Sequence, residues 1–248
     1  MSQLIPAGPR ATPGGFRFDV GSIPGAYANA FRTHRGYLTS NLAQGRSRNV
    51  SRVTGAPTIS GMYAHFTGAR DFVDVDFTES ASCSVFIAAR LPGAGSGGAS
   101  KGILLSARGP SLADPSREAG LVVRQDSETT IRAYANWTKG DGTQDLYIRD
   151  APYTPGAWML LEVKVGPTYL ALFNHTLGGG ASRNDIVGTR EVSGARLRAG
   201  SGSVGSVYAG DVDIAFVYAA PAQFAATLSG TMVADLKAKK MAPVGIEV

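Results

Sequence analysis

The chain has 248 residues, of which 44% are hydrophobic and 17% are charged, and its formal net charge is +5. This length allows one large all-β domain or two small ones, and 32 glycines with 13 prolines are too many for a helical protein. No run of about 18 uninterrupted apolar residues occurs, so no membrane-spanning helix is expected. The composition indicates a globular protein built from many short strands joined by turns.

Positive charge is concentrated near the N-terminus. Residues 1–53 contain seven arginines and a single acidic residue, Asp19, whereas the rest of the chain carries 17 basic and 18 acidic residues. A segment of this kind can contact nucleic acid or an acidic protein surface. We favour protein docking and expect no nucleic-acid partner, because the arginines are spread out and not clustered.

Residues 1–60 have few apolar positions, and Phe16–Val20 is the one short strand expected there. Tyr27, Phe31 and Tyr37 follow neither strand nor helix periodicity, so their own segment offers no means of burying them. We therefore predict an extended basic arm over residues 1–60 that docks on a partner and mediates assembly. The residues expected to make this contact are Arg10, Arg17, Tyr27, Phe31, Arg32, Arg35, Tyr37, Arg46 and Arg48.

Strand signals become regular from residue 61 onward. Phe72–Phe77 alternates apolar side chains with Asp74 and Asp76, and Ser82–Leu91 is almost continuously apolar, as in a central strand covered on both faces. The same reasoning predicts further strands over Met62–Thr67, Gly102–Ala107, Gly120–Arg124, Thr130–Asn136, Asp145–Arg149, Ala195–Ala199 and Tyr208–Tyr218. Short strands separated by Gly and Pro turns predict a sandwich or jelly roll.

A hairpin over residues 156–174 is the clearest motif, with a tight turn at Gly166-Pro167. The period of two places Trp158, Leu160 and Glu162 on one face of its first strand, and Met159, Leu161, Val163 and Val165 on the other. We assign Trp158 to the core. The single cysteine, Cys83, excludes an intrachain disulfide, and its apolar surroundings predict a buried side chain.

A helical period begins after Pro221, where Phe224, Leu228 and Met232 fall in step. Lysines near the expected end of this helix suit the helix dipole. Gly230 is expected to break the helix into two short pieces.

The order of these elements resembles the laminin-G/pentraxin-like domains of the concanavalin A-like lectin/glucanase superfamily, of the kind found in phage virion proteins. The matching motifs, over about residues 61–240, are Phe66-Thr67-Gly68, Phe72–Val75, Cys83–Leu91, Gly102-Ile103-Leu104, the Gly-x-Trp hairpin opened by Gly156, and Gly210-Asp211-Val212-Asp213. The resemblance implies a concanavalin A-like antiparallel β-sandwich over residues 61–248 with a short C-terminal helix. It implies carbohydrate binding or sugar chemistry without choosing between them.

Sandwich glucanases related to this fold use paired carboxylates, and retaining chemistry needs them about 5–5.5 Å apart. The nearest candidates here, Asp71, Asp74 and Asp76, include no glutamate, and the first pair falls on opposite faces of a strand. A calcium ion would need further oxygens from elsewhere, and the three histidines lack metal-ligand spacing. We expect no enzymatic activity, no metal and no cofactor.

Exposed aromatic rings are the expected glycan contacts, because the C–H faces of sugars pack on them. Rings that lie in or beside loops predict the glycan-binding residues Tyr134, Trp137, Tyr147 and Tyr153. The alternative is that these rings cap the core or enter a subunit contact.

These patterns favour a non-enzymatic phage virion protein: a tail accessory, a decoration protein or a fibre-like adhesin. The absence of a signal-peptide pattern before Arg10 favours synthesis in the host cytoplasm and release by lysis. Expected partners are other virion proteins, further copies of the chain in a homo-oligomer such as a trimer, and host-surface glycans, without membrane insertion. The alternatives are a free carbohydrate-binding lectin, a sandwich glycoside hydrolase, and a capsid jelly roll whose arm binds nucleic acid.

Overall fold

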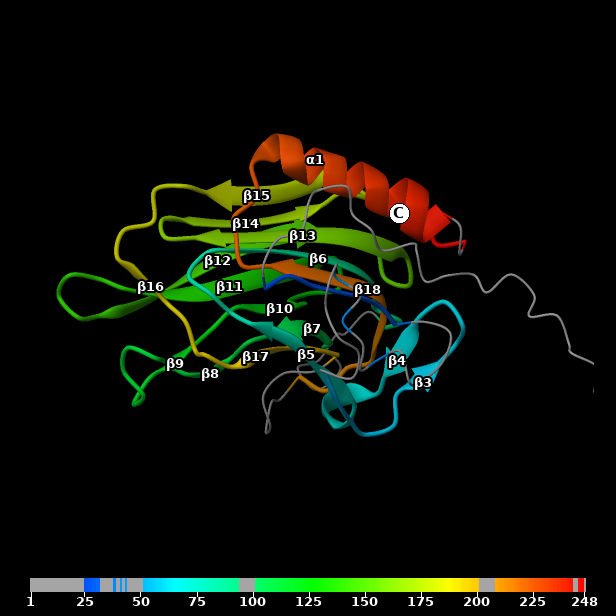
Figure 1. The fold of residues 1–248 in the computed structure, drawn as a ribbon, viewed down its shortest axis with the longest axis horizontal. Helices are drawn as coiled ribbons and strands as arrows, with labels where there is room; N and C mark the ends of the chain where they lie inside the picture. The colour runs from blue at the N-terminus through cyan, green and yellow to red at the C-terminus, as the bar shows by residue number, and fades with distance from the viewer. Residues whose placement is uncertain are drawn as a thin grey trace, which may run out of the picture.

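The computed structural model describes residues 25–31, 38, 41, 43, 51–93, 101–200, 208–242 and 245–247. Two antiparallel sheets pack on each other, and a short helix near the C-terminus lies along the outside of one of them (Figure 1). The all-β sandwich expected from the sequence, with its C-terminal helix, is confirmed.

Two strongly apolar strands, Cys83–Arg90 and Val212–Ala220, lie side by side in the middle of sheet A. Its strands, in spatial order, are β15 (Gly179–Arg183), β14 (Tyr169–Asn174), β13 (Trp158–Gly166), β6 (Cys83–Arg90), β18 (Val212–Ala220), β4 (Ala64–Phe66) and β3 (Thr58–Ile59), with β1 (Tyr27–Ala30) paired to β18. The hairpin expected over residues 156–174 forms β13 and β14, because Gly166 pairs with Tyr169 across a two-residue turn.

Sheet B lies on the other side of the core. Its strands, in spatial order, are β12 (Gln144–Pro152), β11 (Thr130–Thr138), β10 (Val122–Gln125), β7 (Ile103–Ser106), β17 (Arg196–Ala199), β5 (Phe72–Thr78) and β2 (Arg52–Thr54), with β16 (Thr189–Glu191) paired to β11. A separate two-stranded ribbon joins β8 (Gly109–Pro110) to β9 (Glu118–Ala119). The strands that the sequence did not lead us to expect are β1, β2, β3, β8, β9, β15 and β16.

The main core fills the space between the sheets. Alternate residues of β6 and β13 point into it, including Val85, Ile87 and Val163, and all are fully buried. Cys83 is a free, buried thiol, as predicted. Each large aliphatic side chain removed from water here contributes about 1.5–3 kcal/mol before the entropy of ordering it is subtracted.

A second apolar cluster lies on the outer face of sheet A. Phe86 and Leu160 point away from the main core and pack with Met232 and Leu236. Met232 belongs to α1 (Ala226–Asp235), and Leu236 begins the π-helical residues Leu236–Met241 that follow it. The middle of sheet A is therefore covered on both faces, which explains why β6 is continuously apolar from Val85 to Ala89.

The described part of residues 1–60 belongs to the sandwich and is not a separate arm. β1 pairs with β18 over four residues, and β2 and β3 pair with β5 and β4. Tyr27 and Phe31, which we expected at a docking surface, are fully buried in the main core. That expectation is wrong for these two residues, because β18 offers an unpaired edge that β1 fills. Arg10, Arg17, Arg32, Arg35, Tyr37, Arg46, Arg48 and Phe16–Val20 lie outside the described residues.

Trp158 is not part of the main core. It lies on the outer face of sheet A, partly buried, with its ring edge-on to Tyr63 at 5.4 Å between centroids. Its strand has apolar side chains on both faces, so the alternation alone could not tell which face turns inward.

Candidate functional site

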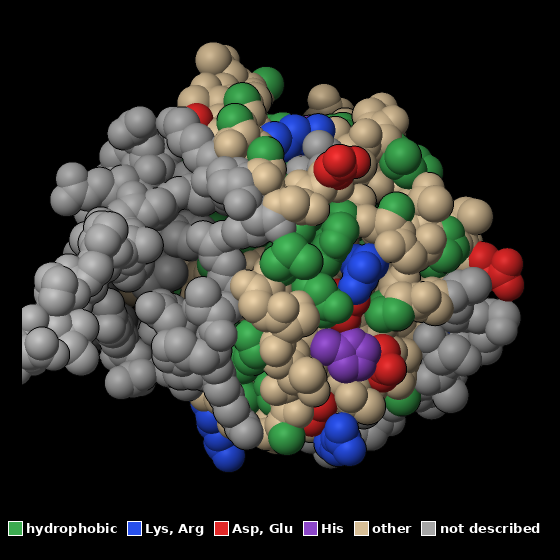
Figure 2. Space-filling model, turned by 90° about the vertical axis from the view of Figure 1, so that its right-hand side faces the viewer, with side chains coloured by type: hydrophobic (Ala, Val, Ile, Leu, Met, Phe, Trp, Pro, Cys, Tyr) green, Lys and Arg blue, Asp and Glu red, His purple; other side chains and the backbone are tan. Residues whose placement is uncertain are grey.

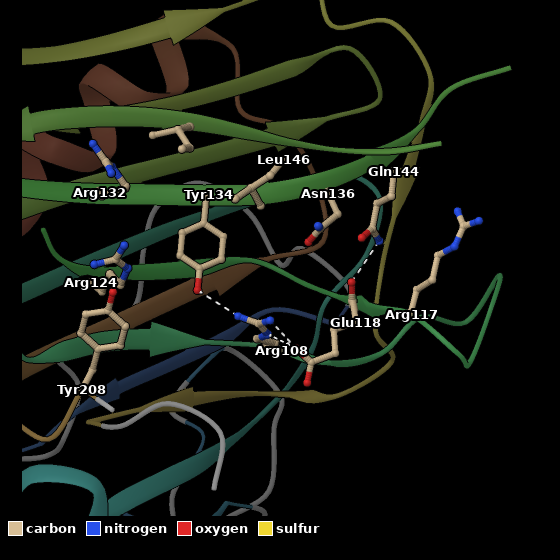
Figure 3. Close-up of a pocket in the computed structure, with 11 residues that line it drawn as sticks. Arg108, Arg117, Glu118, Arg124, Arg132, Tyr134, Asn136, Gln144, Leu146 and Tyr208 are labelled. Carbon is tan, nitrogen blue, oxygen red and sulfur yellow. Dashed lines mark hydrogen bonds and ion pairs between the residues drawn. The ribbon is translucent and has the colours of Figure 1, made fainter. Parts of the chain in front are cut away.

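A hollow of about 450 Å³ opens on the outer face of sheet B (Figure 3). Its floor comes from β10, β11 and β12, and its rim comes from the β8–β9 ribbon and from Tyr208, which precedes β18. The residues that line it are Arg108, Arg117, Glu118, Arg124, Arg132, Tyr134, Asn136, Gln144, Leu146, Ile148 and Tyr208.

The floor follows from the alternation along β11. Ile131, Ala133, Ala135 and Trp137 point into the core, so Arg132, Tyr134 and Asn136 must point outward. Tyr134 pairs in register with Ile148 of β12 and Val122 of β10, and Asn136 pairs with Leu146. The Leu146 side chain is 50% exposed, so the floor offers apolar surface beside its polar groups.

Asn136 presents an unused amide to the hollow. Within the described part of the chain its side chain makes no hydrogen bond, although the backbone carbonyl accepts one from Nη1 of Arg190 at 3.1 Å. The side chain points into the hollow beside Gln144 (Figure 3). It therefore keeps both donors and its acceptor available for a ligand.

The rim is held in place by contacts between the ribbon and the strands. Nε of Arg108 donates to Glu118 at 2.6 Å, and Nη1 of Arg108 lies 3.5 Å from the Tyr134 hydroxyl. Nε2 of Gln144 donates to the Glu118 carbonyl at 3.0 Å. At the base of the ribbon Gly120 has a φ of 120°, and a Cβ there would lie 2.2 Å from the Ala107 carbonyl oxygen, so only glycine fits.

Arg124 lies close to two tyrosine rings. Its guanidinium carbon is 4.3 Å from the ring centroid of Tyr208 and 5.8 Å from that of Tyr134. Both distances are within the range of a cation–π contact. Its nearest carboxylate partner is Asp126 at 3.3 Å, and Asp126 also contacts Arg132 at 3.0 Å.

Two arginines of the hollow, Arg108 and Arg132, have carboxylate partners that raise their pKa values. Burial lowers the pKa of Arg108, but its hydrogen bond to Glu118 and the neighbouring Tyr134 outweigh burial and raise the pKa. The hydrogen bond to Asp150 is the largest cause that raises the pKa of Arg132.

Only one of the four predicted glycan-binding rings lies in the hollow. Tyr134 lines it, whereas Trp137 is fully buried in the core and donates to the Pro167 carbonyl at 2.7 Å. Tyr153 is 3% exposed, and Tyr147 packs edge-on against Trp137. The prediction is therefore wrong for Trp137 and Tyr153, because their rings cap the core, and it stays a prediction for Tyr134 and Tyr147.

Sequence reasoning missed most of the hollow. Arg132 and Asn136 share the parity of Tyr134 on β11, opposite to the apolar positions, and that signal was present in the sequence. No local pattern connects Arg108 or Tyr208 with β11, because the chain brings them there only through the sheet order.

A second polar cluster crosses the outer face of sheet A. His65, Asp213, Arg90 and Trp158 are successive cross-strand partners on β4, β18, β6 and β13. Figure 2 looks at the side of the molecule that is on the right in Figure 1 and shows histidine, acidic and basic side chains gathered among hydrophobic ones. Asp213 accepts from His65 at 2.7 Å and from Arg90 at 2.6 Å, so these groups already satisfy one another.

The acidic residues considered for sugar chemistry or calcium are engaged within the fold. Asp71 accepts from the backbone of Ala56 at 2.9 Å, and Asp74 pairs with Arg198 at 2.8 Å. Among the described residues no group of three His, Cys, Asp or Glu side chains is placed to hold a metal ion. The described helices include none that is long and apolar enough to cross a membrane.

No protein-family model matches this sequence, and no curated protein matches it. Solved structures do match. The binding domain of botulinum neurotoxin serotype D has a TM-score of 0.58 at 10% identity, over 87% of this chain and 52% of that chain. The serotype G binding domain has a TM-score of 0.57 at 9% identity, over 84% of this chain and 50% of that chain. The receptor binding domain of the C/D mosaic serotype has a TM-score of 0.55 at 8% identity, over 84% and 50%.

This chain spans about half the length of these solved structures. At such low identity the likeness shows the fold alone: a β-sandwich of the kind that occurs in toxin binding domains. The finer resemblance to laminin-G/pentraxin-like domains stays a prediction.

Proposed function

We propose that this protein is a glycan-binding module that holds a saccharide in the hollow on the outer face of sheet B. The observation that carries the proposal is the unused Asn136 amide beside two tyrosine rings and several guanidinium groups in one concave site. A volume of about 450 Å³ also falls within the range usual for small-molecule sites, about 300–1,000 Å³.

The chemistry of the lining suits a sugar. Saccharide hydroxyls both donate and accept, so they need planar polar groups of both kinds, which Asn136, Gln144, Glu118 and the arginines supply. The apolar faces of sugar rings need flat apolar partners, which Tyr134 supplies beside Leu146. The receptor-binding role named for the structural neighbours is of the same general class.

Binding to a glycan array, followed by calorimetric titration of the best saccharide, tests this proposal. Asn136→Ala and Tyr134→Ala are each expected to weaken binding by roughly tenfold, since each removes one hydrogen-bonding or packing partner of the ligand. Tyr169→Ala is the matched control, because Tyr169 is also a partly buried strand tyrosine but begins β14 in sheet A.

Two results would contradict the proposal. One is the absence of glycan binding by a folded protein across the array. The other is equal affinity of the parent and both hollow variants for the saccharide found. Release of reducing sugar from the bound saccharide would instead favour the sandwich hydrolase.

We further propose that the module acts as part of a phage particle, as an oligomer attached through its basic N-terminal residues. The support is the sequence itself: seven arginines against one acidic residue in residues 1–53. Mass measurement of the purified protein, together with proteomics of purified particles, tests this role. A protein that stays monomeric and is absent from particles would leave the free lectin as the better description.

A further inference from the structure

We propose that the ligand of the hollow is an acidic saccharide, whose carboxylate binds between Arg108 and Arg124. This inference deepens the proposed function and rests on it. Four arginines line the hollow against one carboxylate, Glu118. The acidic partners of the other arginines, Asp114, Asp126 and Asp150, are not among the lining residues.

Arg108 and Arg124 converge on the same ring. Arg108 contacts the Tyr134 hydroxyl, and the guanidinium of Arg124 lies beside the Tyr134 ring. Figure 3 shows Arg124 next to Tyr208 on one side of the Tyr134 hydroxyl and Arg108 on the other side. A planar guanidinium matches a carboxylate in two parallel hydrogen bonds, so two guanidinium groups near one tyrosine form a suitable carboxylate site.

Arg124 is only partly paired within the fold. Its Nη1 donates to the Gln125 carbonyl at 3.1 Å and its Nη2 lies 3.3 Å from Asp126, while its buried Nε has no hydrogen-bond partner in the described part of the chain. Its one carboxylate neighbour, Asp126, is shared with Arg132. A ligand acceptor near this guanidinium would therefore face a cation that is incompletely neutralised.

Arg108 can be released for a ligand at low cost. Its side chain is 41% exposed and that of Glu118 is 61% exposed, so their ion pair is a surface pair. Surface pairs of this kind contribute little to stability. An incoming carboxylate can thus take the place of the Glu118 carboxylate, and Glu118 becomes the group that opposes an acidic ligand.

The experiment compares matched saccharides and three variants. Oligogalacturonate and its methyl ester share one backbone and differ in charge, and sialylated, sulfated and neutral glycans extend the panel. The parent is expected to prefer the free carboxylate by roughly tenfold, with a preference that falls as salt rises. Arg108→Gln is expected to lower the ratio of acidic to neutral affinity by roughly tenfold, and Glu118→Gln to raise it by roughly threefold.

Arg183→Gln is the matched control. Arg183 is 40% exposed, pairs with Asp185 and lies 5.0 Å from the Tyr147 ring, much as Arg108 pairs with Glu118 beside Tyr134. This variant is expected to bind like the parent. Thermal unfolding checks that all three variants fold, which their exposed positions favour.

The outcomes separate the two proposals. Equal binding of acidic and neutral saccharides, or unchanged ratios in both hollow variants, overturns the acidic ligand and leaves glycan binding in place. A preference for sulfated over carboxylated glycans overturns the carboxylate assignment. Absence of binding throughout the panel overturns both.

Discussion

Glu79 and Arg190 form an ion pair inside the protein, with each side chain only 1% exposed. Arg190 also lies 5.1 Å from the ring of Trp137 and donates to the backbone of Asn136. The pair therefore supports β11 directly behind the floor of the hollow. Burial of two charges is tolerated because each is the partner of the other.

Replacing only one member of this pair should be more damaging than replacing both. Arg190→Met is expected to destabilise the protein by about 3–5 kcal/mol, because it leaves the Glu79 carboxylate buried without its counter-ion. The double variant Glu79→Leu/Arg190→Met should lose less than Arg190→Met alone. Urea unfolding of the parent, the two single variants Glu79→Leu and Arg190→Met, and the double variant measures this coupling, and strictly additive losses would contradict it.

Protonation of Glu162 is expected to lower the stability of the fold in acid. The side chain is buried under α1 and accepts from His175 at 2.8 Å. Burial by itself raises the pKa of Glu162, but hydrogen bonds from His175 and Ser229 and the charge of Lys164 outweigh it, so the pKa lies below its ordinary value. The ionised carboxylate then stabilises the fold at neutral pH, and this contribution disappears as the pH falls below about 4.3 and through the folded-state pKa.

Glu162→Gln should therefore lower stability at pH 7 and flatten the loss of stability in acid. Denaturant unfolding between pH 3 and pH 7, on the order of one pH unit per step, measures both effects. Glu128→Gln, at an exposed position in the β10–β11 turn, serves as the control. Parallel pH profiles for the parent and Glu162→Gln would show that Glu162 does not carry this dependence.

At the scale of elements, α1 forms despite a glycine in its interior. We expected Gly230 to break the helix, but the helix runs through it from Ala226 to Asp235. Met232 and Leu236 are fully buried against the outer face of sheet A, and this packing outweighs the poor helix propensity of one glycine.

Gly230→Ala should stabilise the protein by about 0.5–1 kcal/mol, because alanine loses less backbone entropy in a helix. A Cβ at Gly230 would have no atom within 4 Å, so no clash opposes the gain. Gly120→Ala is the contrasting variant and should destabilise, since its Cβ would overlap the Ala107 carbonyl. A thermal melt of both variants decides this, and a lower melting temperature for Gly230→Ala would contradict the helix assignment.

At the scale of the whole molecule, the position of the hollow follows from the layers. Among the described elements, α1 covers the outer face of sheet A, whereas no helix covers that of sheet B (Figure 1). Sheet B can therefore place polar and charged side chains outward and still bury its inner face. The outer face of sheet B is therefore free to present arginine and tyrosine side chains to a ligand.

The effect of truncating the chain depends on how residues from its N-terminal part pack into the two sheets. Removing residues 1–60 deletes β1, β2 and β3, and with them Tyr27, Phe31 and Leu38 from the core. This truncation is expected to prevent cooperative folding, since two buried rings alone account for several kcal/mol, roughly 3–5 each. Removing only residues 1–24 keeps the pairing of β1 with β18 and should leave a cooperative thermal transition. A shortened chain that lacks residues 1–60 and melts like the parent would restore the separate arm.

Local pattern was enough for several strands of each sheet. A nearly continuous apolar run over residues 82–91 identified β6, and patterns in residues 130–136 and 156–174 identified β11 and the β13–β14 hairpin, because such patterns depend only on neighbours along the chain. The helical period after Pro221 located α1 for the same reason. The sequence by itself thus determined the all-β class, the sandwich and the C-terminal helix.

Contacts between distant segments decided the rest. Trp158 of β13 lies outside the main core, and alternation could not show this, because helix packing makes both faces of sheet A apolar and removes the contrast that shows which face is inward. Tyr27 and Phe31 are buried only because β18 leaves an edge for β1. The hollow joins residues 108, 124, 134 and 208 through the order of strands in sheet B and the path back to β18. Sheet order is set by long-range pairing and packing, for which a single sequence carries no local signal.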